Sequence, residues 1–536
     1  MTNTKNKALL FVSLCIVTYI IHNEITILDM IVDLKYTTIN FFNDGHILNG
    51  YEVYSFLQSH DVRISNQVID KTDFVPFCRH PSISDNLKSF KSHLHWKDRA
   101  RNSSMLRTQA NISQLHLVIY KHKTKDNYIG KLHIQTFNRR GEMKFNGGDY
   151  WRATIIGGSM RASINIQDKS DGTYTGWFPV LFPGIFSVHV VLEFSNYEGI
   201  TDPPLDWFSK GSIQGRFQPD GIIGPVDQFL NEDGPISQFR ITGTHFQTEN
   251  TLNKELFGFD QQCDTFINTE CGFWKESNFK GYRPHKIKNI PKKIMPRESK
   301  HLTKNVLSNQ TKQYQNKQLD TLWIYGDSQG RRFYWSLIKY ELCTKLFKKC
   351  DHTYTWTYKH FNSNSHDDRY KFTGDDFNET RILNDIKFDI TRPETRSSRS
   401  VVLINFGLHI VLSVGLERGF RLFDSFIDMV KKIRVNHRPD KVPLIIWKTT
   451  TLPVLENVPS VLNSTGLRFM TKQRIDAWNS YTITAACKSD LPILAVHNHP
   501  PACPFKPVDW VHFEYQVFRK VEDELKTFLI HKYGIP

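Results

Sequence analysis

Two short segments, far apart in the chain, carry the residue types that acyl-transfer chemistry needs. Gly326-Asp327-Ser328 directly follows the apolar run Thr321–Tyr325. An apolar run that ends in a small residue predicts a buried strand, with the serine hydroxyl presented at its C-terminal end. Asp509-Trp-Val-His512, near the C-terminus, can supply a general base and the carboxylate that orients it. Together the segments predict a Ser-His-Asp triad built from residues remote in sequence.

Each member of this predicted triad has a distinct role. A serine hydroxyl is a weak nucleophile until a base removes its proton, and His512 is predicted to be that base. Asp509 would hold the other ring nitrogen and stabilise the imidazolium. A helix that begins at Ser328 would add backbone N–H groups for an oxyanion. Gly-Asp-Ser alone is also a good helix cap, and Asp327 is predicted to be structural.

A third segment, Asn405-Phe-Gly407, ends another apolar run. An asparagine amide and a glycine N–H at a strand end are suitable oxyanion donors, so Asn405 and Gly407 are predicted at the site. A plain strand-to-loop turn is the alternative interpretation. His497-Asn-His499, with Cys503 nearby, has no evident third ligand, and no metal site is predicted.

The elements that must position these residues follow from the pattern after residue 319, where apolar runs alternate with helical stretches. Continuous apolar runs are typical of parallel strands buried on both faces. The pattern predicts a three-layer α/β/α domain over 319–536, with ligands at the C-terminal edge of its strands. Strands are expected at 321–326, 401–406, 444–448 and 491–496, and helices at 330–346, 417–435, 471–487 and 512–531.

An earlier region, 105–200, instead contains short β-rich segments separated by Gly, Asn and Asp turn signals. Alternation is clean from Phe186 to Phe194, as in a half-buried strand. Short strands at this spacing predict an immunoglobulin-like β-sandwich. Residues 35–104 are predicted to be a stem or irregular lead-in, and 201–318 a connector that includes a basic, Pro-containing linker.

The three catalytic blocks resemble a known family. Gly326-Asp327-Ser328, Asn405-x-Gly407 and Asp509-x-x-His512 are similar to those of SGNH/GDSL-type esterases. Arg331, three residues after the serine, resembles the Gly-Asp-Ser-x-x-Arg form of the PC-esterase branch. That branch includes sialate O-acetyltransferases and plant trichome-birefringence-like polysaccharide O-acetyltransferases. Members of this family usually have a glycine in their second sequence block that contributes to the oxyanion hole. This glycine is not obvious here, since only Gly374 lies between Gly330 and Gly407.

The β-rich region adds a second resemblance. Gly147–Arg152 and Asp171–Gly176 are similar to segments of neurexophilin. Over roughly residues 75–536 the chain therefore resembles the neurexophilin and PC-esterase domain family. The resemblance implies an SGNH-hydrolase-like C-terminal domain and an acetyl-serine at Ser328, from which acetyl passes to glycan hydroxyls.

Three functions are compatible with these features. The first is a serine acyltransferase that acts on glycans or glycoproteins, for example sialylated ones. Arg331 would then bind a carboxylate of the glycan or the oxyanion of the reaction. It requires no cofactor, and a donor such as acetyl-CoA would be a co-substrate. The second is an acetyl esterase with the same triad. The third is an inactive secreted ligand that binds a cell-surface receptor through the β-sandwich.

The net charge of the chain indicates which class of binding partner to expect. The chain of 536 residues has 69 Lys+Arg against 54 Asp+Glu, a net charge of +15. This balance favours acidic partners. From Lys280 to Lys304 nine residues are basic and one, Glu298, is acidic, which is typical of a solvated linker or a binder of acidic glycans. No nucleic-acid-binding motif accompanies it, so nucleic acid is not expected.

The N-terminus and the cysteines indicate the secretory pathway. Lys5 and Lys7 precede the apolar stretch Ala8–Ile21, and residues 1–34 are predicted to be a signal peptide or a signal anchor. The protein is expected to be secreted or anchored in the Golgi lumen, with membrane contact only through this segment. Close spacing favours three disulfides, Cys263–Cys271, Cys343–Cys350 and Cys487–Cys503, and leaves Cys78 over; candidate glycosylation sites are Asn102, Asn111, Asn309, Asn378 and Asn463.

Overall fold

The computed structural model describes residues 53–55, 62–65, 107–121, 128–158, 160–180, 183–195, 202–208, 217–221, 228–241, 266–267, 273–275, 318–356, 359–360, 377–454, 468–497, 507–509 and 511–535. All belong to the compact unit Glu52–Pro536. The predicted signal or anchor segment lies outside them. Among the described helices, none combines the length and apolarity needed to cross a bilayer.

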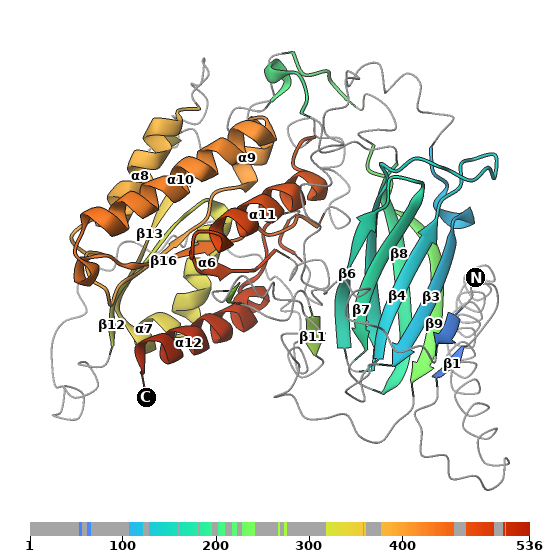
Figure 1. Cartoon of the computed structure of the whole chain (residues 1–536), viewed down its shortest axis with the longest axis horizontal. Coiled ribbons are helices and arrows are strands. Elements are labelled where there is room, and N and C mark those ends of the chain that lie inside the picture. The colour runs from blue at the N-terminus through green and yellow to red at the C-terminus, as the bar shows by residue number, and fades with distance from the viewer. Residues whose placement is uncertain are drawn as a thin grey trace, which may run out of the picture. The chain divides into compact units, whose positions relative to one another are not determined.

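The first part of the chain forms a largely antiparallel sheet (Figure 1). Within the described residues it has ten strands, in the order β1-β9-β8-β5-β6-β7-β4-β3-β2, with β11 on β6. The only parallel pair in it is β2 with β3. The strands are β1 Val53–Ser55, β2 Val62–Ser65, β3 Gln114–Lys121, β4 Tyr128–Gln135, β5 Tyr150–Gly157, β6 Met160–Asp168, β7 Thr173–Val180, β8 Gly184–Phe194, β9 Glu232–Ile241 and β11 Phe273–Lys275.

This sheet differs from the predicted sandwich in one respect. Strand β6 pairs with β5 through Met160–Ile164 and with β7 through Asn165–Asp168. One strand therefore belongs to both halves, and the strands join into a single near-barrel sheet instead of two separate ones. The immunoglobulin-like topology is not confirmed.

Strand β9 lies in the region predicted to be a connector, so that prediction was too simple for residues 232–241. It pairs antiparallel with β8 along most of its length. Its buried positions alternate, but they include Ser237, whereas Ile236 is half exposed. A polar residue, Ser237, faces the core, and an aliphatic one, Ile236, faces water. The two-residue period of the strand is therefore not visible in the sequence as an alternation of apolar and polar residues.

The C-terminal part contains a second, mostly parallel sheet with the strand order β10-β17-β16-β15-β12-β13-β14. The pair β13–β14 is antiparallel. If β12, β13, β15, β16 and β17 are numbered 1 to 5 in chain order, their spatial order across the sheet is 2-1-3-4-5. The connections therefore reverse direction between β12 and β15, and in such sheets ligands bind at this point. The strands are β10 Phe266–Ile267, β12 Leu319–Gly326, β13 Phe347–Trp356, β14 Lys359–His360, β15 Val401–Ile404, β16 Leu444–Lys448 and β17 Ile493–Leu494.

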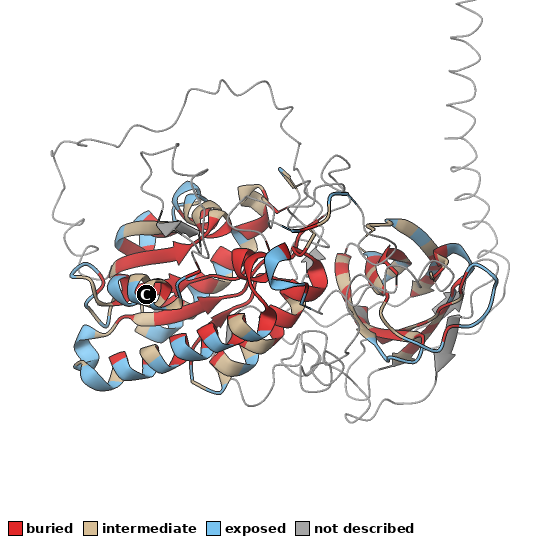
Figure 2. Ribbon diagram, turned by 90° about the horizontal axis from the view of Figure 1, so that it is seen from above, coloured by how far each residue is buried: buried red, intermediate tan, exposed pale blue. Residues whose placement is uncertain are grey.

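Helices cover both faces of this sheet, which makes three layers (Figure 1). Along β12, Trp323 and Tyr325 enter one core, whereas Leu322 and Ile324 enter the other. The strands in the middle are buried throughout (Figure 2). The first core includes α8 Glu379–Thr391, α9 Leu408–Ser413, α10 Leu416–Asn436 and α11 Lys472–Cys487; the second includes α6 Ser328–Lys339, α7 Leu342–Leu346 and α12 Arg519–Tyr533.

Two predicted helix boundaries were wrong. The helix expected over 330–346 is interrupted, because Glu341 has a positive φ of 64° and separates α6 from α7. The helix expected from His512 begins only at Arg519, after the 3-10 turn Tyr515–Phe518. His512 itself therefore lies in an irregular segment. Strands β10, β13 and β14 and helices α8 and α9 were not predicted at all, and neither were β1, β2 and β11 of the first sheet.

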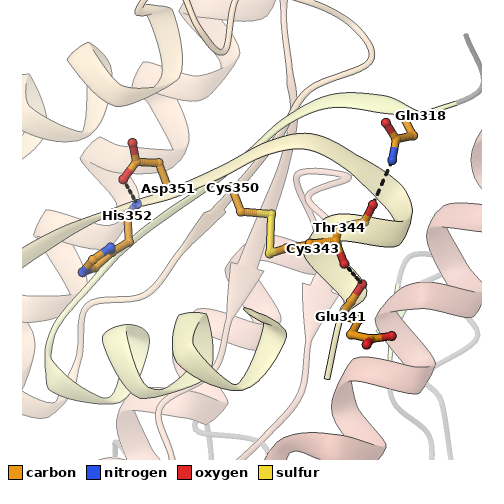
Figure 3. Close-up of a disulfide and its surroundings, with 7 residues drawn as sticks. All are labelled: Gln318, Glu341, Cys343, Thr344, Cys350, Asp351 and His352. Atoms are coloured by element: carbon orange, nitrogen blue, oxygen red, sulfur yellow. Dashed lines mark hydrogen bonds between the residues drawn. A yellow bond between two sulfur atoms is a disulfide. The ribbon is translucent and has the colours of Figure 1, made fainter. Parts of the chain in front are cut away.

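One predicted disulfide is fully visible. Cys343 of α7 is bonded to Cys350 of β13 (Figure 3). Cys487 is disulfide-bonded, but Cys503, its predicted partner, lies outside the described residues, as do Cys78, Cys263 and Cys271. Asn111 and Asn378 are exposed; the other glycosylation candidates, Asn102, Asn309 and Asn463, are outside the described residues.

Buried polar contacts join the two sheets. Glu193, at the end of β8, accepts hydrogen bonds from Lys472 of α11 at 2.6 Å and from Arg152 at 2.8 Å. The side chains of Glu193 and Lys472 are 0% and 2% exposed. Buried charges require such partners. In the predicted connector, Asp202 accepts from the N–H of Leu416 at the start of α10.

Candidate active site

Ser328 is the first residue of α6 and directly follows β12. Asp327 occupies the N-cap position, and its side chain accepts from the backbone N–H groups of Gln329 and Gly330. The predicted structural role of Asp327 is thus a helix cap. Because the strand ends and the helix begins within two residues, Ser328 lies at the C-terminal edge of the sheet.

The Asp509–His512 segment is a turn closed by one carboxylate. Asp509 Oδ1 accepts from the N–H of Val511 at 2.9 Å and of His512 at 2.8 Å. The N–H of Val508 donates to His512 O at 2.8 Å. The short aspartate side chain thereby bonds its own backbone, as this residue type does in turns. Its second oxygen remains directed at the histidine ring.

The structure brings Ser328, His512 and Asp509 together in hydrogen-bonding order. His512 Nδ1 is 2.6 Å from Asp509 Oδ2, and His512 Nε2 is 2.7 Å from Ser328 Oγ. If Nδ1 carries the proton, the ring donates to the carboxylate and Nε2 accepts from the hydroxyl. That tautomer is the one a general base needs.

The Asp509 carboxylate is held in its charged form. Burial raises the pKa of Asp509, but hydrogen bonds from the His512 ring and from the N–H groups of Val511 and His512 outweigh it and lower the pKa to about 2. A fixed negative charge therefore faces Nδ1 across the physiological pH range, where it can stabilise an imidazolium.

Asn405 and Gly407 lie beside the site in a closely packed arrangement. Asn405 is fully buried, and its amide donates to Lys448 O at 2.8 Å. A Cβ on Gly407 would come within 2.1 Å of Thr450 Oγ1 and 2.4 Å of Trp478 Nε1. Both residues thus have packing roles here. Their assignment as oxyanion donors stays a prediction; the Asn405 amide has a second N–H, which is directed at Thr450 Oγ1 at 3.4 Å.

Arg331, one turn after Ser328, is held between aromatic rings. Its guanidinium lies 4.2 Å from the ring centroid of Tyr354 and 4.9 Å from that of Trp335. Tyr354 is the register partner of Gly326, so it lies at the same level of the sheet edge as the serine loop. The Arg331 Nε is buried and has no hydrogen-bond partner in the described structure. Guanidinium groups on aromatic faces keep donors for carboxylates.

Two ionisable side chains that the sequence did not single out lie near the triad. Lys448, the last residue of β16, is fully buried, and its Nζ donates to Thr449 O at 3.4 Å. Burial lowers the pKa of Lys448 to about 8, against the opposing effect of Asp327. Burial also lowers the pKa of His409; Asp327 raises it and His512 lowers it. The position of Lys448 at the end of β16 was the available sequence signal; His409 lies in α9, shortly after β15.

The histidine pair considered for a metal is only partly visible. His497 Nδ1 lies 3.2 Å from Thr449 Oγ1, and His499 is outside the described residues. In the described ranges, no group of three or more His, Cys, Asp or Glu side chains could hold a metal ion.

Comparisons with known proteins give distant structural similarities. No family model matches the chain, and no curated protein does. A carbohydrate acetylesterase family member from Sinorhizobium meliloti covers 40% of this chain and 100% of its own, at 12% identity and a TM-score of 0.27. The periplasmic domain of a Salmonella ser. Paratyphi A lipopolysaccharide acetyltransferase covers 40% and 82%, at 13% and 0.23.

A third solved structure covers more of the chain. An active-site mutant of a family two carbohydrate esterase from Clostridium thermocellum covers 76% of this chain and 93% of its own, at 9% identity and a TM-score of 0.24. Scores of this size do not establish a shared fold, and the named activities belong to those proteins. Any function must be argued from the site itself.

Proposed function

We propose that this protein is a serine-dependent acyltransferase that moves an acetyl group onto glycan hydroxyls through an acetyl-serine at Ser328. The observation that carries the proposal is the position of His512, within 2.7 Å of Ser328 Oγ and 2.6 Å of Asp509 Oδ2. An inactive scaffold has no need to keep all three side chains in this order. The receptor-ligand alternative is therefore less well supported.

The reaction would follow from this geometry. His512 Nε2 takes the Ser328 proton as Oγ attacks the acetyl carbonyl of the donor, and the imidazolium returns the proton to the leaving group. A sugar hydroxyl then gives its proton to His512 and attacks the acetyl-serine. The imidazolium returns this proton to Ser328 Oγ as the acyl bond breaks, which restores the hydroxyl and forms the glycan ester. The backbone N–H of Ser328, with Asn405 and Gly407, is the proposed oxyanion donor set, because the N–H groups of Gln329 and Gly330 already donate to Asp327.

Three observations support a glycan, and in particular an acidic one, as acceptor. The chain has a net charge of +15, which attracts anionic partners. Arg331 stands one turn from the serine with a buried Nε that has no partner within the described residues. The catalytic blocks resemble those of the neurexophilin and PC-esterase domain family. We therefore infer an SGNH-type catalytic domain, a neurexophilin-like β domain, and a sialylated acceptor.

The remaining features of the proposal concern cellular context. The protein would work in the secretory lumen, Golgi-anchored or secreted, and would touch the membrane only through residues 1–34. It needs no cofactor of its own, and acetyl-CoA or another acetyl ester would be the co-substrate. The β domain could in addition bind a cell-surface receptor.

Water in place of the sugar would make the same triad an acetyl esterase, so one experiment separates the two. The full chain and Ser328→Ala are incubated with an acetyl donor ester and a sialylated glycan, and mass spectrometry follows free acetate and acetylated sugar. Serine-dependent acetylation of the sugar supports the transferase, and serine-dependent acetate release alone supports the esterase. If folded wild type and variant behave alike, the catalytic proposal is wrong.

A further inference from the structure

Helix α6, which begins with the proposed nucleophile, also holds the segment that carries the proposed base. Three of its side chains donate to backbone carbonyls of that segment. Gln329 Nε2 binds Val511 O at 3.2 Å, Arg332 Nη1 binds Phe513 O at 3.4 Å, and Ser336 Oγ binds Tyr515 O at 3.2 Å. One face of the helix therefore meets every second carbonyl of an irregular segment.

Gln329 makes the contact closest to the chemistry. Its side chain is 1% exposed. Its Nε2 binds the carbonyl of Val511, the residue directly before His512. Its Oε1 accepts from the N–H of Thr451 at 3.3 Å and from the Thr451 hydroxyl. One carboxamide therefore joins the serine loop, the loop after β16 and the loop of His512, and uses both its donor and its acceptor.

We propose that Gln329 is a positioning residue that keeps His512 in hydrogen-bonding distance of Ser328. The inference rests on the proposed function. The Asp509–His512 bond lies within one short turn, whereas the His512–Ser328 bond spans two separate segments. Loss of the Gln329 contacts should therefore separate the base from the nucleophile and leave the base paired with its carboxylate.

The test measures how fast a fluorophosphonate labels the active serine of the full chain, which requires no knowledge of donor or acceptor. Gln329→Met keeps the volume and removes all three hydrogen bonds, and Thr451→Val removes only the one from the Thr451 hydroxyl. Gln318→Met is the matched control, because Gln318 makes a similar bond, to Thr344 O at 2.9 Å, at the opposite end of β12.

We expect Gln329→Met to slow labelling by about 10- to 100-fold, the usual cost of a small misplacement of reacting groups. Thr451→Val should slow it less, and Gln318→Met should match wild type. The pH midpoint of the labelling rate should stay unchanged in Gln329→Met, because the Asp509 contact persists. A general loosening of the fold would instead lower the melting temperature and shift that midpoint.

Each outcome separates this inference from the proposed function. If wild type and Ser328→Ala label equally, the proposed function fails, and the role of Gln329 fails with it. If Ser328 labels but Gln329→Met does so at the wild-type rate, only the positioning role is wrong. If Gln329→Met does not fold, Thr451→Val decides: an unchanged labelling rate overturns the inference.

Discussion

Ser336 of α6 and Glu522 of α12 are joined by a buried hydrogen bond between their side chains. The Ser336 hydroxyl lies against Glu522 Oε1 and is also 3.2 Å from Tyr515 O. A hydroxyl has a single proton, and a carbonyl has none. Burial raises the pKa of Glu522 to about 8. At neutral pH Glu522 is therefore protonated, and a neutral carboxyl group is able to donate to Ser336 and leave the serine proton for Tyr515 O.

This relationship predicts a pH dependence of stability. The folded protein holds the Glu522 proton up to about pH 8, whereas the unfolded chain releases it near the ordinary value of 4.5. The contribution of Glu522 is therefore full below pH 4.5 and is lost as pH rises toward 8. In urea titrations from pH 5 to 8.5, Glu522→Gln should remove this part of the decline in unfolding free energy.

The control for that titration is Glu417→Gln. The Glu417 side chain is 84% exposed, so its replacement should leave the slope as in wild type. Equal slopes for Glu522→Gln and wild type would mean that Glu522 is ionised in the folded protein.

The triad geometry predicts a large effect of Asp509→Asn. An asparagine cannot fix the ring tautomer or stabilise the imidazolium, so serine-dependent turnover should fall by about 10⁴-fold. The expected signature is a loss of kcat with little change in KM, measured with a chromogenic acetyl ester. A loss of less than about tenfold would indicate that another group orients His512.

Acid should abolish the proposed serine-dependent activity without discharging Asp509. The pKa of Asp509 is lowered to about 2, so any stability that it contributes is present above its unfolded value near 3.8 and is lost only as pH falls through about 2. Between pH 7 and 4, the activity at each pH, expressed as a fraction of the activity at pH 7, should therefore be the same for wild type and Asp509→Glu. A separate acid limb near pH 4, present only in wild type, would contradict this.

The buried ion pair between Glu193 of β8 and Lys472 of α11 predicts a strong stability effect. Lys472→Met should lower the unfolding free energy by about 3 kcal/mol, the lower end for a broken buried pair, because Arg152 still contacts Glu193. Lys345→Met is the matched control. Its pair with Glu341 is 63% exposed on both sides, so the change should be below about 0.5 kcal/mol. Similar costs for the two variants in urea denaturation would be incompatible with a buried pair.

Two glycines near the site should respond oppositely to alanine. In Gly407→Ala the new methyl group would overlap Thr450 and Trp478, and we expect a loss of about 1–3 kcal/mol. Gly330 lies in α6, and a Cβ there meets only Ile324 at 3.8 Å. Gly330→Ala should stabilise the protein by about 0.5–1 kcal/mol. Calorimetry of both variants tests the packing on the two sides of the sheet edge.

The sequence predicted the parts of the fold whose patterns are local. Strands such as β12, β15 and β16 are continuous apolar runs, and α10 and α11 lie where helical spacing indicated them. Strand β13 was missed because its sequence, Phe347–Trp356, is rich in lysine and threonine. Polar strands of this kind occur at or near the edge of a sheet, where one side is less covered.

The candidate site was predicted only as far as residue types and spacing can define it. Ser328, Asp509 and His512 belong to recognisable segments. Gln329 was not singled out, because its importance comes from the Val511 carbonyl and the Thr451 N–H, which are 182 and 122 positions away in the sequence. The same holds for Lys448, whose burial depends on how α6 covers the end of β16. Long-range contacts have no local sequence pattern.

The Glu193–Lys472 pair also has a consequence for biosynthesis. Glu193 emerges from the ribosome 279 residues before Lys472. Chains of this size fold domain by domain as they are made, so the first sheet would form while the Glu193 carboxylate is still hydrated. It would lose that water only when α11 docks. Docking of α11 is therefore the step that replaces this water with the Lys472 ammonium group.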